Sequence, residues 1–433
     1  MNYDLEIMAP VGSPECLAAA IRAGANSIYF GIENLNMRAH SASTFSIDDL
    51  RRIAEETHRF GIKSYLTVNT IIYGEDLELM RQIIDAAHEA GISAVIASDV
   101  AVMLYCREVG QEVHLSTQLN ISNVEALRFY AQFADVVVLA RELNMEQVKA
   151  IHEAIEAENI CGPSGKQVRI EMFCHGALCM AISGKCYLSQ SNWGRSANRG
   201  ECMQLCRRRY TVTDVETGTE LDIENKYIMS PKDLKTIHFI DKMIDAGVRV
   251  FKIEGRARGP EYVDTVVRCY REAIDTLTTP EKGREAFLER LDEWDERLAR
   301  VFNRGFWDGY YLGARMGEWS SVYGSQATRR KVYVGKVTNW FARIGVVEVQ
   351  VEATPLRRGE EVLFIGHTTG ILPVKAEDLR VDLEPADVCP QGVRCSIAVP
   401  LEGMPEDHVN PDSEPGERLH PRRGDKVFRW ETA

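Results

Sequence analysis

Short apolar runs alternate with longer amphipathic stretches from residue 4 to about residue 275. The runs are rich in β-branched residues, and the intervals between them are long enough to hold a helix, which is the pattern of a parallel sheet with crossover helices. The pattern predicts eight strands, at Leu5–Ala9, Ser27–Phe30, Lys63–Val68, Ala94–Ala97, Val113–Ser116, Val136–Leu139, Val168–Phe173 and Val248–Ile253.

The intervening stretches read as helices. Pro14–Ala23 has proline in the favoured first turn, and Ile47–Phe60 separates its apolar and charged residues at helical spacing. Eight strands with helices between them predict an α/β fold, a TIM-like (β/α)8 barrel. A doubly wound open sheet gives the same alternation, and it is disfavoured because the strand count is eight and no Gly-rich dinucleotide fingerprint is present.

Breaks in this rhythm predict three domains or segments. Residues 1–280 form the catalytic barrel, and a polar, glycine-rich insertion at 175–225 lacks helical periodicity. Residues 281–325 form a helical connector. Residues 326–433 contain the strand-like segments VYVGKV, GVVEVQVE, EVLFIG and DKVFRW separated by glycine turns, so a small antiparallel β-barrel is expected there.

Composition places the chain among soluble proteins. With 45% hydrophobic residues it has enough apolar surface for a core, and it shows neither a targeting segment nor an apolar run of membrane-spanning length, so a cytoplasmic location and no membrane partner are expected. The 51 basic and 64 acidic residues give a net charge of −13. That balance argues against broad binding to nucleic acid or anionic lipid and leaves room for a local basic site.

Four of the 11 cysteines lie in the insertion as C-x6-C-x15-C-x3-C, namely Cys179, Cys186, Cys202 and Cys206. Four thiolates suffice for a [4Fe–4S] cluster. A zinc site is the alternative, but its usual paired spacing fits only the second pair; unligated thiols are a further alternative. Cys174 and His175 lie just before the group and could replace one ligand. We therefore predict metal ligation by these cysteines, with Cys206 the least firmly assigned.

The insertion is basic, against the overall balance of the chain. Residues 184–210 contain one acidic residue, Glu201, and six basic ones: Lys185, Arg195, Arg199, Arg207, Arg208 and Arg209. Such cations suit an anionic cluster, a small carboxylate or nucleic-acid phosphates, and a solvated charged loop is the plain alternative. Tyr187, Trp193 and Tyr210 add either stacking surfaces or packing anchors.

Charged residues also follow the predicted strands, and in such barrels chemistry gathers at the carboxyl ends of strands. The candidate catalytic residues are Arg141 and Glu142 after strand six, Glu171 and His175 on strand seven, and Lys252, Glu254 and Arg256 on strand eight. A buried carboxylate here would serve as a general base, and an arginine would grip a carboxylate at two points. An HExxH motif is absent, and ordinary hydrolase signals are missing.

The sequence resembles the U32 family, historically filed as peptidases or collagenases. The resemblance rests on APVGSPECLAAAIRAGANSIYFG at 9–31, VNT at 68–70, HLSTQ at 114–118, LARE at 139–142, EMFCHGALCMAISGKCYLS at 171–189, RGECMQLCRR at 199–208, YIMSPKDL at 227–234, FKIEGRARGPEYV at 251–263 and FNRGF at 302–306. The downstream β-domain is similar to the family's C-terminal barrel.

The resemblance implies a TIM-like core, a [4Fe–4S] cluster on the cysteine insertion and, in several branches, oxygen-independent hydroxylation. Those branches act on the wobble uridine of tRNA, on ribosomal RNA cytidine or in ubiquinone synthesis, and length together with the β-domain favours the first. By this resemblance prephenate is the hydroxyl donor and 5-hydroxyuridine the product, with the anticodon arm held by Arg207–Arg209 and the β-domain.

Three classes of function therefore stay open on the sequence: a tRNA hydroxylase, a U32-type endopeptidase, and an iron–sulfur accessory protein of a quinone hydroxylation complex. The net charge of −13 counts against the first. The missing nucleophile and metal-water signals count against the second.

Overall fold

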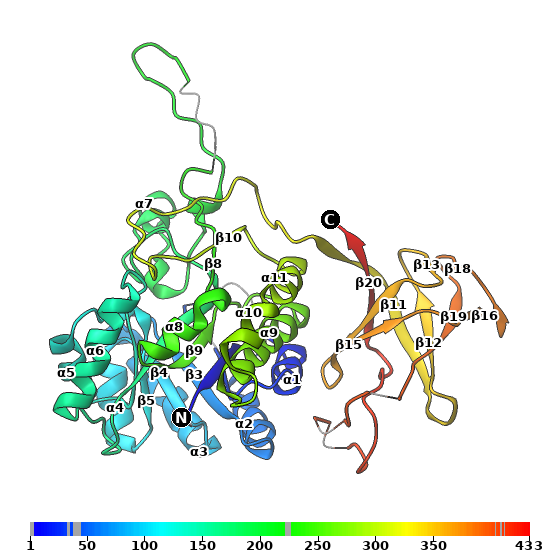
Figure 1. The fold of residues 1–433 in the computed structure, drawn as a ribbon, viewed down its shortest axis with the longest axis horizontal. Helices are drawn as coiled ribbons and strands as arrows, with labels where there is room; N and C mark the ends of the chain where they lie inside the picture. The colour runs from blue at the N-terminus through cyan, green and yellow to red at the C-terminus, as the bar shows by residue number, and fades with distance from the viewer. Residues whose placement is uncertain are drawn as a thin grey trace.

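The computed structural model describes residues 4–32, 35–37, 45–220, 227–402, 404–407, 409–410 and 412–433. Figure 1 shows a barrel of strands wrapped by helices, a separate sheet domain formed by the C-terminal part of the chain, and an arm that projects from the insertion above α7 (Leu188–Trp193). The barrel and the sheet domain are separate domains, because each has its own core of buried apolar residues.

The barrel strands confirm the predicted set. They are β1 (Glu6–Pro10), β2 (Ser27–Phe30), β3 (Lys63–Val68), β4 (Ala94–Ala97), β5 (Val113–Leu115), β6 (Val136–Val138), β7 (Arg169–Ala177) and β9 (Val248–Ile253). Each strand pairs in parallel with the next, and β9 pairs with both β7 and β1, which closes the barrel. The open doubly wound sheet is thereby excluded.

Apolar side chains fill the interior of the barrel, and a charged network closes its amino-terminal end. Met8, Tyr29, Tyr65 and Val250 belong to the interior cluster. Below them the buried Glu6 carboxylate accepts hydrogen bonds from Lys63 at 3.0 Å, the Tyr65 hydroxyl at 2.7 Å and Arg169 at 3.0 Å. Because TIM-like barrels carry their chemistry at the carboxyl ends of the strands, we assign this network to the stability of the fold and place the chemistry at the opposite end.

Burial alone would raise the pKa of Glu6. The charges of Lys63 and Arg169, and hydrogen bonds from Ser27 and Tyr65, more than offset that effect and lower the pKa to about 2. The carboxylate is therefore ionised in the folded protein at neutral pH.

The barrel helices are α1 (Pro14–Arg22), α2 (Leu50–Arg59), α3 (Leu77–Ala90), α4 (Val100–Val109), α5 (Val124–Ala131), α6 (Met145–Glu158), α8 (Ile240–Asp245) and α9 (Pro260–Thr278). The Ser13 side chain caps α1 by accepting from the Cys16 amide, and Pro14 opens the first turn as predicted. The predicted helix at 47–60 divides into a 3-10 turn over Ile47–Asp49 followed by α2.

The sequence pattern did not predict two short strands that lie beside the barrel. β8 (Asp233–Lys235) pairs antiparallel with the end of β7, and β10 (Phe306–Trp307) pairs with β8. The connector holds helices α10 (Gly283–Glu289) and α11 (Leu291–Arg300) and then runs through β10. These pairings bring residues from the connector to the carboxyl end of the barrel.

The C-terminal domain is an antiparallel sheet. Its main strands are β11 (Arg329–Phe341), β12 (Val346–Val351), β14 (Glu361–Gly366), β15 (Gly370–Lys375), β16 (Leu379–Val381), β19 (Arg394–Ala398) and β20 (Lys426–Thr432), in the order β15-β14-β20-β11-β12-β19-β16. The four predicted segments correspond to β11, β12, β14 and β20. The pattern did not predict β15, β16 and β19, which belong to the same sheet.

The C-terminal domain packs on α1 of the barrel. The guanidinium of Arg22 donates to the carbonyls of Thr368 and Thr369 and lies 2.7 Å from Oδ1 of Asp407, with both side chains of the pair buried. Gly370 has a φ of +63°, and a Cβ there would come within 3.0 Å of the Ala19 nitrogen on α1. Close packing and a buried ion pair therefore fix the two bodies against each other.

None of the helices in the described ranges is long and apolar enough to cross a membrane.

Candidate functional site

One cavity of about 270 Å³ lies at the carboxyl ends of the barrel strands, beneath the insertion. Its walls include Tyr29 from β2, Thr67 from β3, Phe173 from β7 and Lys252 from β9, so strands from around the barrel meet in it. This is the end of the barrel at which TIM-like enzymes carry out their chemistry.

The four predicted cysteine ligands, Cys179, Cys186, Cys202 and Cys206, all line this cavity. Cys179 follows β7, Cys186 precedes α7, and Cys206 lies in the 3-10 turn Leu205–Arg207. All four are free thiols. Among the described residues, no group of three or more His, Cys, Asp or Glu side chains has a geometry that could hold a metal ion.

The thiols are close enough to influence one another electrostatically. Burial raises the pKa of Cys206 to about 11, the Arg207 charge opposes that rise, and Cys179, Cys202 and Cys186 each add to it. A cationic iron–sulfur core would reverse this balance, because thiolates are the ligands that such clusters need. Four thiols that open into one cavity are therefore a donor set of the right number and chemistry for a [4Fe–4S] cluster.

The cavity is also strongly cationic. Its lining includes Arg141, Arg207, Lys252, Arg256, Arg258 and Arg304. Glu254 is the one acid among the described residues that line it. The excess of positive charge runs against the net charge of −13 for the whole chain. The cavity is thus suited to anionic contents, such as a thiolate-bound cluster, a carboxylate or a phosphate.

Arg256 is held in the wall by the chain itself. One guanidinium nitrogen donates to Oγ1 of Thr67 at 2.7 Å and to Oδ1 of Asn36 at 3.2 Å, and the guanidinium stacks over the ring of Tyr29. The Tyr29 hydroxyl lies 3.2 Å from Oε2 of Glu254. These contacts hold the predicted Glu254 and Arg256 in fixed positions at the mouth of the barrel.

Lys252 and Glu171 pair across neighbouring strands. The Lys252 ammonium lies 2.7 Å from Oε1 of Glu171, and it also faces the rings of Tyr29 and Phe173. Lys252 lines the cavity, whereas Glu171 is fully buried beneath it. The carboxylate can therefore act on cavity contents only through Lys252.

His175 lies outside the lining of the cavity. Its ring packs among Tyr262, Tyr270 and Phe306, because β7 changes register with β9 between Phe173 and His175 and so turns this side chain away. Burial, with a contribution from the charge of Lys235, lowers the pKa of His175 to about 3. The imidazole is therefore neutral and enclosed by aromatic rings at physiological pH.

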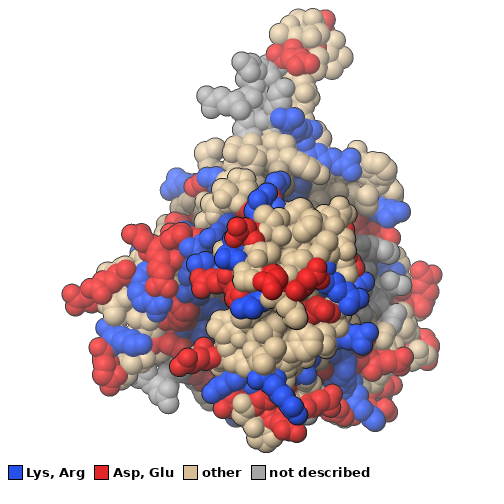
Figure 2. Space-filling model, turned by 90° about the vertical axis from the view of Figure 1, so that its right-hand side faces the viewer, with Lys and Arg blue, Asp and Glu red and all other residues tan. Residues whose placement is uncertain are grey.

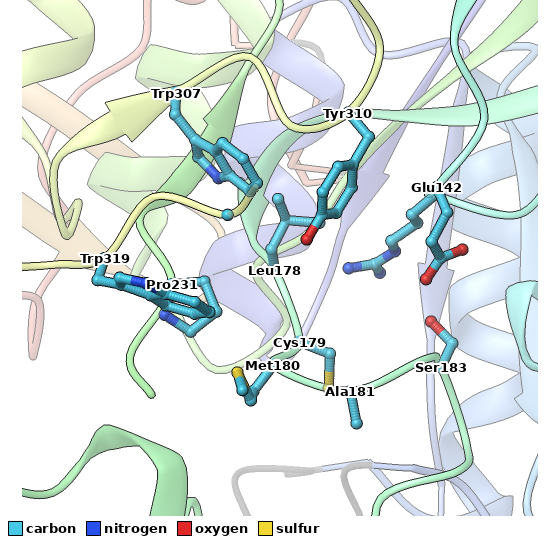
Figure 3. A pocket seen from close by; sticks show the side chains of 12 residues that line it. Glu142, Leu178, Cys179, Met180, Ala181, Ser183, Pro231, Trp307, Tyr310 and Trp319 are labelled. Atoms are coloured by element: carbon cyan, nitrogen blue, oxygen red, sulfur yellow. The ribbon is translucent and has the colours of Figure 1, made fainter. Parts of the chain in front are cut away.

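Arg141 and Glu142 lead into a second, smaller pocket on the other side of the Cys179 segment. Arg141 lines both spaces, and Glu142 lines only the second, together with Trp307, Tyr310 and Trp319. Figure 3 shows the Trp319 ring against Pro231, and the Cys179 side chain pointing away from Trp307 and Tyr310. Glu142 is thus separated from the cationic cavity.

Arg207 cross-links the segments that carry the cysteines. Its guanidinium donates to the carbonyl of Leu178 at 2.6 Å, the carbonyl of Pro231 at 2.5 Å and Oγ of Ser230 at 3.2 Å. Leu178 is adjacent to Cys179, and Arg207 is adjacent to Cys206. This cation is engaged inside the protein, whereas Arg208 and Arg209 of the predicted nucleic-acid-binding run are exposed.

The structure adds two cationic cavity residues that the sequence pattern did not single out. Arg258 lies just beyond β9, two residues after Arg256, so the basic run that follows this strand was an available signal. Arg304 comes from the connector and pairs with the buried Asp233 of β8 at 3.2 Å. No local pattern could place it here, because a pairing between distant segments brings it to the cavity.

Comparison with known proteins agrees with this architecture. The model of peptidase family U32 matches residues 12–321. A protein named collagenase from Porphyromonas gingivalis is 63% identical over 406 residues, which cover 94% of this chain and 97% of that protein. The chain therefore belongs to peptidase family U32.

Other relatives have names that refer to RNA. The tRNA hydroxylation protein P1 of Bacillus subtilis is 32% identical, over 83% of each chain. The 23S rRNA 5-hydroxycytidine C2501 synthase of Escherichia coli is 36% identical over 73% of this chain and 46% of that protein. The family thus includes proteins named for protein cleavage and proteins named for RNA hydroxylation.

Proposed function

We propose that this chain is an iron–sulfur enzyme that hydroxylates the wobble uridine of tRNA to 5-hydroxyuridine, with prephenate as the hydroxyl donor. The observation that carries the proposal is the composition of the cavity: four thiols and six cationic side chains around one space at the catalytic end of the barrel. Relatives named for tRNA and rRNA hydroxylation support the choice of reaction.

In this proposal Cys179, Cys186, Cys202 and Cys206 hold the [4Fe–4S] cluster, which when bound supplies single-electron redox chemistry beside the cationic wall. Lys252 and Arg256 bind the two carboxylates of the donor, since each presents a fixed cation to the cavity. In the overall reaction, the C5–H bond of the uracil is replaced by a C5–OH bond. The donor loses this hydroxyl group and takes up the hydrogen in its place, so no outside oxidant is needed.

Proteolysis is the second candidate, and the 63% identity to a protein named collagenase favours it. A peptidase needs an activated nucleophile or water at an open site. The described lining of the cavity contains no histidine, and His175 is enclosed by aromatic rings with its pKa near 3. The geometry of the cavity therefore favours hydroxylation over proteolysis.

Nucleoside mass spectrometry of tRNA tests the proposal. A strain without the gene is expected to lose 5-hydroxyuridine and its derivatives, and the wild-type gene should restore them. A Cys202→Ser gene should fail to restore them, while Cys161→Ser, which changes a thiol outside the cavity, should succeed. Unchanged 5-hydroxyuridine in the deletion strain, with no second hydroxylase in its genome, would refute the proposal.

A further inference from the structure

The insertion presents an exposed surface beside the cavity that combines aromatic rings with cations that form no salt bridge among the described residues. We call it the rim and define it as Lys185, Tyr187, Trp193, Arg195, Arg208 and Arg209. Tyr187 is 73% exposed and Trp193 is 55% exposed, although rings of this size are usually more buried. Two large exposed aromatic rings on one short insertion are a feature that packing of the fold does not require.

The cations of the rim are available to a partner. Lys185, Arg195, Arg208 and Arg209 form no salt bridge within the described part of the chain, and the Arg209 guanidinium lies 5.7 Å from the centre of the Tyr227 ring. The Arg208 guanidinium lies over the Trp193 ring, 5.7 Å from its centre, so a cation covers one face of this aromatic side chain. Figure 2 shows basic side chains at the foot of the projecting arm.

The rim is continuous with the cavity. Lys185 and Tyr187 flank Cys186 in sequence, and Arg208 follows Arg207, so rim residues alternate with cavity-lining residues. The short helix α7, which carries Trp193, is fixed to the Cys202 segment because Oγ of Ser189 accepts a hydrogen bond from the Met203 amide at 3.0 Å. A polymer bound on the rim would therefore have its next unit at the cavity entrance.

The chemistry of the rim matches unpaired RNA. Exposed aromatic faces stack on bases that are not in a duplex, and neighbouring arginines and lysines bind the phosphates between them. The name collagenase, which one relative carries, implies a collagen-type peptide as the alternative ligand, and proline-rich peptides also bind in aromatic grooves. Such a peptide does not carry one negative charge per unit, so it does not account for the four rim cations that form no salt bridge.

From these observations we infer that the rim binds single-stranded loop nucleotides of the RNA substrate, stacking bases on Trp193 and Tyr187 and holding phosphates with Arg208 and Arg209. This inference rests on the proposed function and assigns the surface that presents the target loop. Arg207 takes no part in it, because its guanidinium is bound inside the protein.

The test measures binding of the full-length holoprotein to a synthetic anticodon stem-loop RNA and to a duplex RNA of equal length. We expect the stem-loop to bind more tightly. Trp193→Ala and Tyr187→Ala should each weaken stem-loop binding about 5- to 150-fold, the range for one lost base–aromatic stack. Phe129→Ala is the matched control, because Phe129 on α5 is similarly exposed at 58% and lies outside the insertion.

Salt dependence tests the cations separately. The double variant Arg208→Gln/Arg209→Gln should lower the slope of log Kd against log salt by about 1.4, which corresponds to two lost phosphate contacts on single-stranded RNA. Arg51→Gln, at an exposed position on α2, should leave the slope unchanged. All these substitutions are on the surface, so the thermal midpoint should stay at the wild-type value.

Unchanged stem-loop affinity in both aromatic variants would overturn the inference, as would equal affinity for duplex RNA. Tight binding of a Gly-X-Y collagen peptide that Trp193→Ala abolishes would assign the rim to protein instead. Failure of the proposed function looks different: stem-loop binding would depend on Trp193 and Tyr187, but the bound RNA would never gain a hydroxyl group.

Discussion

The ammonium nitrogen of Lys252, which lines the cavity, lies 2.7 Å from Oε1 of Glu171 on the neighbouring strand β7. Both side chains are buried, and Oε2 of Glu171 has no hydrogen-bond partner among the described residues. Removing one partner of such a pair leaves a buried charge uncompensated, which is the costly way to break it.

Lys252→Met should therefore lower the free energy of unfolding by about 3–5 kcal/mol and abolish activity. The double variant Lys252→Met/Glu171→Leu removes both charges, so it should recover much of that stability while remaining inactive. Urea unfolding and product formation, measured on both variants, separate the two effects. Activity in the stable double variant would show that Lys252 does not bind substrate.

The cysteine assignment predicts a clear contrast between two thiols. Cys202→Ser should eliminate the iron and the broad visible absorbance of the anaerobically purified protein, because one cluster ligand is lost. Cys161→Ser should keep both, since Cys161 lies outside the cavity. Iron and sulfide analysis with the visible spectrum provides the measurement. Zinc in place of iron in the wild-type protein would contradict the assignment.

Acid should destabilise the protein through Glu6. Its pKa is lowered from 4.5 to about 2 in the folded state, so its contribution is fully present above pH 4.5 and is lost as pH falls towards 2. The difference corresponds to about 3 kcal/mol. Free energies of unfolding between pH 2 and pH 7 should show a steeper acid loss for the wild type than for Glu6→Gln. Glu55→Gln, at an exposed position on α2, should follow the wild-type curve.

Contact between the two bodies should depend on Arg22. Arg22→Leu removes its hydrogen bonds to Thr368, Thr369 and Asp407, although Asp407 keeps Arg422 at 2.8 Å. We expect a loss of about 1–3 kcal/mol and earlier proteolytic release of the C-terminal domain. Arg128→Leu, which breaks only exposed ion pairs, should change stability by less than about 0.5 kcal/mol. Identical proteolysis of both variants would contradict this prediction.

Much of the barrel could be predicted from sequence, since each of its eight strands is an apolar run bounded by amphipathic helices. β8 and β10 could not, because strands of three and two residues carry no periodic signal. The cysteine spacing singled out four thiols that the structure places around one cavity, and their ligation of a cluster stays a prediction. The position of these thiols over the barrel mouth became visible only in the structure.

The sequence predicted many of the charged residues of the cavity, but it predicted less well where their side chains lie. Strand-end positions identified Arg141, Lys252, Glu254 and Arg256, all of which line the cavity. The strand-end position also selected His175, which lies outside the cavity because a register shift in β7 turns its side chain away. Arg304 depends on a tertiary pairing that local sequence does not encode.

We propose that this U32 protein modifies RNA. A reaction under anaerobic conditions that contains holoprotein, prephenate and tRNA lacking the wobble modification, analysed by mass spectrometry of the nucleosides, tests this function directly. We expect 5-hydroxyuridine at the wobble position, dependent on prephenate and absent with Cys202→Ser. Unmodified tRNA from the cluster-loaded protein, together with cleavage of collagen by the same preparation at a defined site, would contradict it.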